Sequence, residues 1–120
     1  MCPAILSKSD NNPIELGGEM VYRVGNGVTS PKLKNQVKVT IPKDSRKAMR
    51  NHRVDKASGL LAFVVGVDGL PRDVCIEKPI GFGFDAVAAE AAMKYRFRPA
   101  IKDGKPVAVI ITFTVNFKLS

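Results

Sequence analysis

The chain has 120 residues, with 45% hydrophobic and 25% charged side chains. This composition predicts one globular domain that folds without a metal or a disulfide, and it excludes a largely disordered chain. The formal net charge of +8 favours anionic partners, such as nucleic acid, acidic protein, anionic lipid or cell-wall polymer, without choosing among them. A charge that serves solubility alone is the alternative.

No segment predicts a membrane span or a metal centre. The longest apolar stretch, residues 60–67, is far shorter than the roughly 20 residues that a spanning helix needs. Residues 1–20 lack the basic and apolar regions of a signal peptide. Cys2 and Cys75 are too far apart for a ligand cluster. We expect either a cytoplasmic protein or a piece of a longer exported or anchored chain.

Residues 1–30 are predicted to be a loosely structured lead-in, and residues 31–120 the folded domain. The lead-in is dense in Ser, Asp, Asn, Pro and Gly without a period. It offers at most a short strand before the turn Gly25-Asn26-Gly27. In the following segment, 31–41, alternating apolar residues predict another extended piece.

Pro42 predicts the start of a short helix, because proline suits the first helical position. The helix extends from Lys43 to about His52. Between residues 43 and 56 there are six Lys or Arg against two Asp, so this helix should be basic and mostly exposed.

The run 60–67 is apolar on both faces and rich in β-branched residues, which predicts a central strand. Asp68-Gly69 is a hairpin turn signal, and residues 72–78 form the return strand. An Ala-rich segment from Phe84 to Tyr95 has one continuous apolar face and predicts a helix packed on the sheet. It should end before Pro99.

The last strand, residues 107–117, alternates most regularly. Its odd-numbered positions are all apolar, whereas its even-numbered positions are largely polar. The fold class is therefore α+β: a small antiparallel sheet of about three core strands, one helix on a face and a short basic helix before it. Pairing with 60–67 would leave the last strand at an edge, with a row of unpaired backbone groups.

No catalytic constellation is predicted. His52 is the only histidine, and its place in the basic run predicts a solvated helix-terminal side chain rather than a catalyst. Gly81-Phe82-Gly83-Phe84 echoes an RNA-binding signature, but an Ala-rich helix follows at once. We interpret it as a glycine loop in which Phe84 anchors that helix. We expect no enzyme activity, no metal and no cofactor.

Three motifs carry a family resemblance. They are the hairpin around Val67-Asp68-Gly69, the helix end Lys94-Tyr95-Arg96-Phe97-Arg98-Pro99, and Asp103-Gly104-Lys105-Pro106 before the last strand. From about Lys38 to Leu119 the chain resembles the C-terminal domain of TonB-family energy transducers. Ile41-Pro42 stands where Tyr-Pro is usual in that family.

The resemblance implies a periplasmic interaction domain that couples inner-membrane energy to transport by binding an extended segment of an outer-membrane receptor. Strand addition at the last strand is the expected mode. The predicted partner-binding residues are Lys38, Val39, Thr40, Ile110, Thr112, Thr114 and Asn116. The resemblance also implies a membrane anchor and a Pro-rich spacer outside this chain.

Two alternatives remain open. A small basic nucleic-acid-binding domain would use the basic patch Arg46, Lys47, Arg50 and Arg53. A homodimerising interaction module would pair two copies through the edge strand. Separately, Cys2 directly after Met1 would fit a lipoprotein whose signal peptide has been replaced, and an ordinary terminal residue is the other interpretation.

Overall fold

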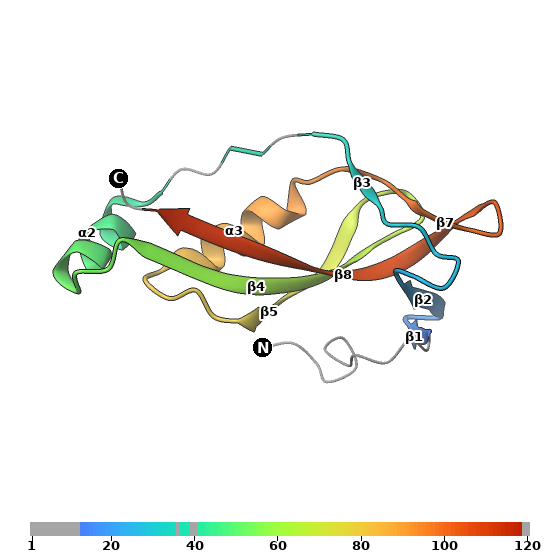
Figure 1. The fold of residues 1–120 in the computed structure, drawn as a ribbon, viewed down its shortest axis with the longest axis horizontal. Coiled ribbons are helices and arrows are strands. Elements are labelled where there is room, and N and C mark those ends of the chain that lie inside the picture. The colour runs from blue at the N-terminus through green and yellow to red at the C-terminus, as the bar shows by residue number, and fades with distance from the viewer. Residues whose placement is uncertain (1–12, 36, 39–40, 119–120) are drawn as a thin grey trace.

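The computed structural model describes residues 13–35, 37–38 and 41–118. Within these ranges the chain forms a six-stranded sheet, a two-stranded ribbon and two helices (Figure 1). In chain order the elements are β1 (Ile14–Leu16), β2 (Glu19–Arg23), β3 (Lys32–Leu33), α2 (Lys43–Asn51), β4 (Lys56–Val65), β5 (Pro71–Lys78), α3 (Phe84–Met93), β6 (Phe97–Arg98), β7 (Ala100–Lys102) and β8 (Lys105–Lys118). The α+β class predicted from the sequence is confirmed.

Strand β4 is central, as predicted. It pairs antiparallel with β8 in an unbroken register from Lys56↔Lys118 to Val65↔Val109, and antiparallel with β5 on its other edge. Residues 61–65 of β4 are each at most 1% exposed. A strand covered on both faces needs apolar side chains at consecutive positions, which explains the continuous apolar run.

The turn between β4 and β5 depends on Gly69. Its φ is +80°, in the left-handed region that glycine adopts without strain. A Cβ at this position would lie 2.0 Å from the carbonyl oxygen of Phe97. The Gly69 carbonyl accepts a 3.0 Å hydrogen bond from the Phe97 amide. The hairpin tip is therefore fixed against β6.

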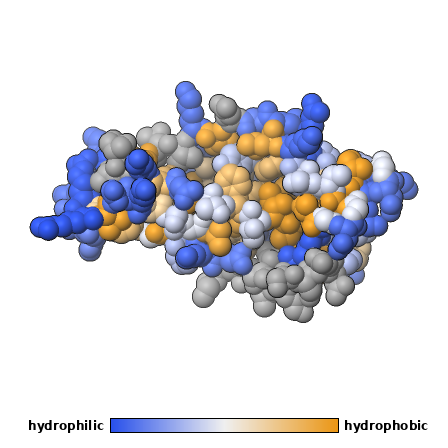
Figure 2. All heavy atoms as spheres, viewed as in Figure 1, coloured by the Kyte–Doolittle hydropathy of each residue, from blue (hydrophilic) through white to orange (hydrophobic). Residues whose placement is uncertain are grey.

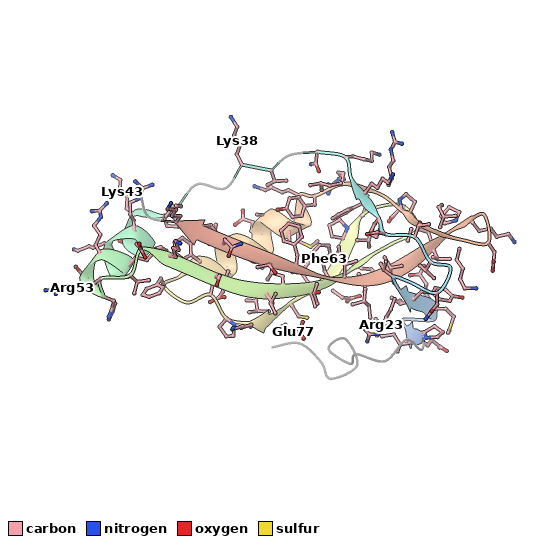
Figure 3. All side chains as sticks on the ribbon, in the orientation of Figure 1. Arg23, Lys38, Lys43, Arg53, Phe63 and Glu77 are labelled. Atoms are coloured by element: carbon pink, nitrogen blue, oxygen red, sulfur yellow. The ribbon has the colours of Figure 1, made fainter. Side chains whose placement is uncertain are left out.

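Helix α3 covers one face of the sheet and builds the larger core. Phe84 is fully buried at its first turn and stacks on Phe117 of β8, with ring centroids 4.1 Å apart. Asp85 fixes the preceding glycine loop, because its carboxylate accepts hydrogen bonds from the amides of Ile80 and Gly81. Phe63 lies in the middle of this core (Figure 3). The glycine-loop interpretation of this motif is confirmed.

The N-terminal part differs from the expectation of a loose lead-in. Strands β1 and β2 form a hairpin, and β2 joins the main sheet by parallel pairing with β8. Val21 is fully buried there with Val64 of β4, in a second, smaller core on the face opposite α3. The sheet consequently has more than three strands and is not wholly antiparallel. The many Gly and Asn residues suggested a loop, but Gly17 and Gly18 form the turn of this hairpin.

An ion pair joins two strands that are not neighbours in the sheet. Arg72 at the start of β5 donates to Glu19 at the start of β2, so the sheet curls until these strands meet. This hydrogen bond raises the pKa of Arg72 above its usual value. The pair ties the β1–β2 hairpin to the far side of the sheet.

Helix α2 projects at one end of the molecule (Figure 1). Only Ser45 and Met49 are buried in it, which confirms a short and mostly exposed helix. The segment before it forms β3, which pairs with β6 rather than with β8. Cys2 lies outside the described residues, as do Val39 and Thr40.

Candidate partner-binding edge

The two edges of β8 are occupied to different extents. Val109 and Ile110 pair with β4 on one side and with β2 on the other. The contact with β2 covers only residues 108–110, here called the closed segment. Beyond it, residues 111–118 pair with β4 alone among the described parts of the chain. In this open segment, alternate backbone N–H and C=O groups point away from β4, and no strand formed by residues 13–35, 37–38 or 41–118 lies beside them.

The side chains of the open segment divide between two faces. Thr112, Thr114 and Asn116 are exposed, as predicted. Ile111, Phe113 and Val115 are only partly buried against the core beneath α3. An added strand would therefore meet hydroxyl and amide groups on one face and incompletely covered apolar groups on the other.

The structure corrects one predicted contact residue and does not describe two others. Ile110 is only 5% exposed, because the β1–β2 hairpin covers it together with Val21 and Val64. Its side chain is not the outward, partner-facing group that alternation suggested. The predicted stretch Val39 and Thr40 lies outside the described residues. Lys38 is exposed and points into solvent (Figure 3).

The predicted basic patch lies on and just after α2. Its members Arg46, Lys47, Arg50 and Arg53 are all exposed, and hydrophilic atoms gather over this end of the molecule (Figure 2). Three of them line a shallow hollow together with Ile41 and Lys43. The structure brings the patch together as helical spacing predicts, at the end of the sheet where β8 finishes.

His52 caps the C-terminal end of α2 and is exposed, with its ring centroid 5.9 Å from that of Phe82. It is thus a solvated helix-terminal residue, as predicted. Within the described ranges, no three His, Cys, Asp or Glu side chains are grouped so that they could hold a metal ion. No helix in the same ranges is long and apolar enough to cross a membrane.

Sequence reasoning missed a second group of cations. It lies on the ribbon β3–β6, where residues 32–34 run beside residues 96–98. The two stretches are more than 60 positions apart in the chain, and no local pattern links them. The signal that was available is the concentration of Lys and Arg in each stretch alone.

The described residues form a short α+β domain with a curled sheet, one covering helix and a long strand that pairs with β4 alone over residues 111–118. Comparison with known families identifies the domain. Residues 45–119 match the family described as the Gram-negative bacterial TonB protein C-terminal. The chain belongs to this family, whose members are non-enzymatic interaction domains of the bacterial periplasm.

A solved structure supports the fold. The solution structure of the Pseudomonas aeruginosa TonB C-terminal domain has a TM-score of 0.55 to this chain at 24% identity, and the match covers 80% of this chain and 90% of that one. A search of curated proteins found no significant match. The predicted family and fold are thus confirmed, and a general role in receptor interaction follows from the family.

Proposed function

We propose that the domain binds an extended segment of an outer-membrane receptor by adding it as a strand to residues 111–118. The observation that carries this proposal is the open edge of β8, which extends a sheet already held by the long register with β4. In its full-length context in the periplasm, the domain would thereby couple inner-membrane energy to transport. Partner-binding roles for Thr112, Thr114 and Asn116 are part of this proposal.

The geometry defines the sequence pattern of a suitable segment. Side chains of an added strand alternate between the two faces of the sheet. Those on one face would lie beside Thr112 and Thr114 and could be polar, whereas those on the other would cover Phe113 and Val115 and should be apolar. The segment pairs over at most eight residues, because β2 occupies the edge before residue 111.

Affinity should be modest. Each main-chain hydrogen bond contributes only about 1 kcal/mol net, and ordering a flexible peptide offsets much of that gain. A reversible contact suits a domain that engages receptors in turn.

The test is a titration of isotope-labelled domain with a peptide from the periplasmic terminus of an outer-membrane receptor, followed by backbone amide NMR. Shifts should concentrate in residues 111–116. The matched control is the same peptide N-methylated at alternate amides, which keeps the side chains but removes the donors, and it should bind at least about tenfold more weakly, since two lost bonds of about 1 kcal/mol suffice. Shifts confined to residues 43–53 would refute the proposal.

The same titration distinguishes the alternatives. A nucleic-acid domain would show shifts on α2 with a single-stranded oligonucleotide, and its affinity would fall steeply with salt. A homodimer through the open edge would show concentration-dependent shifts in residues 111–116 without peptide. Strand addition is favoured over nucleic-acid binding, because stacking on bases requires exposed aromatic side chains and all eight Phe and Tyr side chains are buried or half-buried.

A further inference from the structure

The ribbon β3–β6 carries cations on one face. Leu33 of β3 lies opposite Phe97 of β6 in antiparallel register. The residues on either side of this pair are cationic and exposed, and because side chains alternate they share the face away from Phe97. They are Lys32 opposite Arg98, and Lys34, whose amide donates a 2.7 Å hydrogen bond to the carbonyl of Arg96.

This arrangement is unfavourable for the ribbon by itself, because like charges directly opposite each other destabilise a strand pair. Arg96 is partly compensated, since its guanidinium donates to the carbonyls of Met93 and Tyr95 at the end of α3. The other three cations form no ion pair with any described residue. The positive charges of Lys32, Lys34 and Arg98 therefore remain close together on this ribbon, where an external anion would neutralise them.

Exposed aliphatic side chains lie on the hairpin tip next to the ribbon. The Phe97 amide donates to Gly69, so the tip of the β4–β5 hairpin lies along the edge of β6 away from β3. This tip exposes Val67 by 49% and Leu70 by 42%. Cations beside aliphatic groups are the combination that binds the interface of a charged bilayer, where headgroups meet acyl chains.

We propose that the ribbon and the adjoining hairpin tip form a docking surface for an anionic phospholipid bilayer. The phosphate headgroups would neutralise Lys32, Lys34 and Arg98. The aliphatic tip would insert among the headgroups. This surface is separate from the open edge of β8, and the inference holds whether or not that edge binds a receptor.

Other polyanions fit the surface less well. A single-stranded nucleic acid is bound through stacking on aromatic side chains, and the ribbon offers none, since Phe97 is buried. An acidic polypeptide would be neutralised by the cations but would gain little from Val67 and Leu70. A free phosphate ion would need an enclosing site, whereas these cations lie on an open face.

The test is co-sedimentation of the domain with vesicles of phosphatidylcholine alone and with 30% or more phosphatidylglycerol. Each basic residue near an anionic surface contributes roughly fivefold to partitioning, so K32Q/K34Q/R98Q should lower the partition coefficient for anionic vesicles by about 100-fold. The matched control is R46Q/K47Q/R50Q on α2, which removes the same three charges from the net charge of +8. This control should lose far less.

A second variant, Leu70→Ser, tests insertion without a change in charge and should lower partitioning severalfold. Circular dichroism and thermal melting verify that each variant is folded. Equal losses for the two triple variants would show attraction by net charge alone and would overturn the proposal. Equal binding of the unmodified domain to neutral and anionic vesicles would also overturn it. So would a domain that shows no affinity for anionic vesicles but binds polyglutamate or an oligonucleotide and loses that binding in K32Q/K34Q/R98Q.

Discussion

The closed and open segments of β8 share one strand but have different neighbours. In the closed segment, Ala108, Val109 and Ile110 are each at most 5% exposed. The hairpin covers Ala108 and Ile110, and the core beneath α3 covers Val109. In the open segment, Thr112 and Thr114 remain exposed although the strand continues in the same register with β4. The change falls where β2 ends.

The difference shows that the polarity of the side chains along one face of a strand follows what packs against that face. The odd-numbered side chains of β8 are apolar from Val107 to Phe117, because α3 and the main core lie on that side. The even-numbered ones change from Ala and Ile to Thr, Thr and Asn at residue 112. The apolar residues thus mark where the hairpin covers this face, and the polar ones mark where none of the described residues covers it.

The largest expected effect comes from Ile110→Ala in the closed segment. Truncating this buried side chain should lower the free energy of unfolding by about 2–5 kcal/mol, since it removes apolar contacts and leaves a cavity. Urea unfolding followed by circular dichroism measures it. The matched control, Thr112→Ala in the open segment, should change stability by no more than about 0.5 kcal/mol. Similar losses of unfolding free energy in both variants would mean that Ile110 and Thr112 are equally buried.

A smaller effect is expected from Val21→Ala, which weakens the hairpin without changing a residue of β8. Val21 is fully buried, and the loss should be about 2 kcal/mol from two methyl groups and the resulting cavity. If the hairpin opens as a unit, the amides of residues 108–110 that point toward β2 should exchange roughly 30-fold faster, whereas Val115 should be unchanged. Val24→Ala, at a position 42% exposed, is the control. Equal acceleration along the whole strand would instead indicate global unfolding.

The smallest effect is expected from Glu19→Gln, which breaks the ion pair with Arg72. Both side chains are about a third exposed or more, and such pairs contribute about 0–1 kcal/mol. The loss should shrink further at high salt. Thermal melting at two salt concentrations, with Glu15→Gln as the control, checks it. A loss that salt does not alter would show that Glu19 acts through packing rather than charge.

The main sheet and both helices could be predicted from the sequence because their signals are local. The two-faced apolar run of β4, the Asp-Gly turn and the alternation of β8 each lie within a dozen residues. The β1–β2 hairpin could not be recognised, since its turn glycines and short strands resemble a loop until Val21 is buried by Val64 and Ile110. For the same reason Ile110 was predicted to face outward: alternation assigns a side chain to a face but does not tell what covers that face.

The register between β4 and β8 also has a mechanical consequence. It runs unbroken from Lys56↔Lys118 to Val65↔Val109, and its hydrogen bonds lie across the strand direction. A force applied along β8 loads these bonds in shear, so that they resist together. A force applied across the strand would open them one after another. A partner strand paired along residues 111–118 and pulled along its own axis would load its hydrogen bonds in shear in the same way. Single-molecule pulling should therefore give a higher rupture force along the strand than across it.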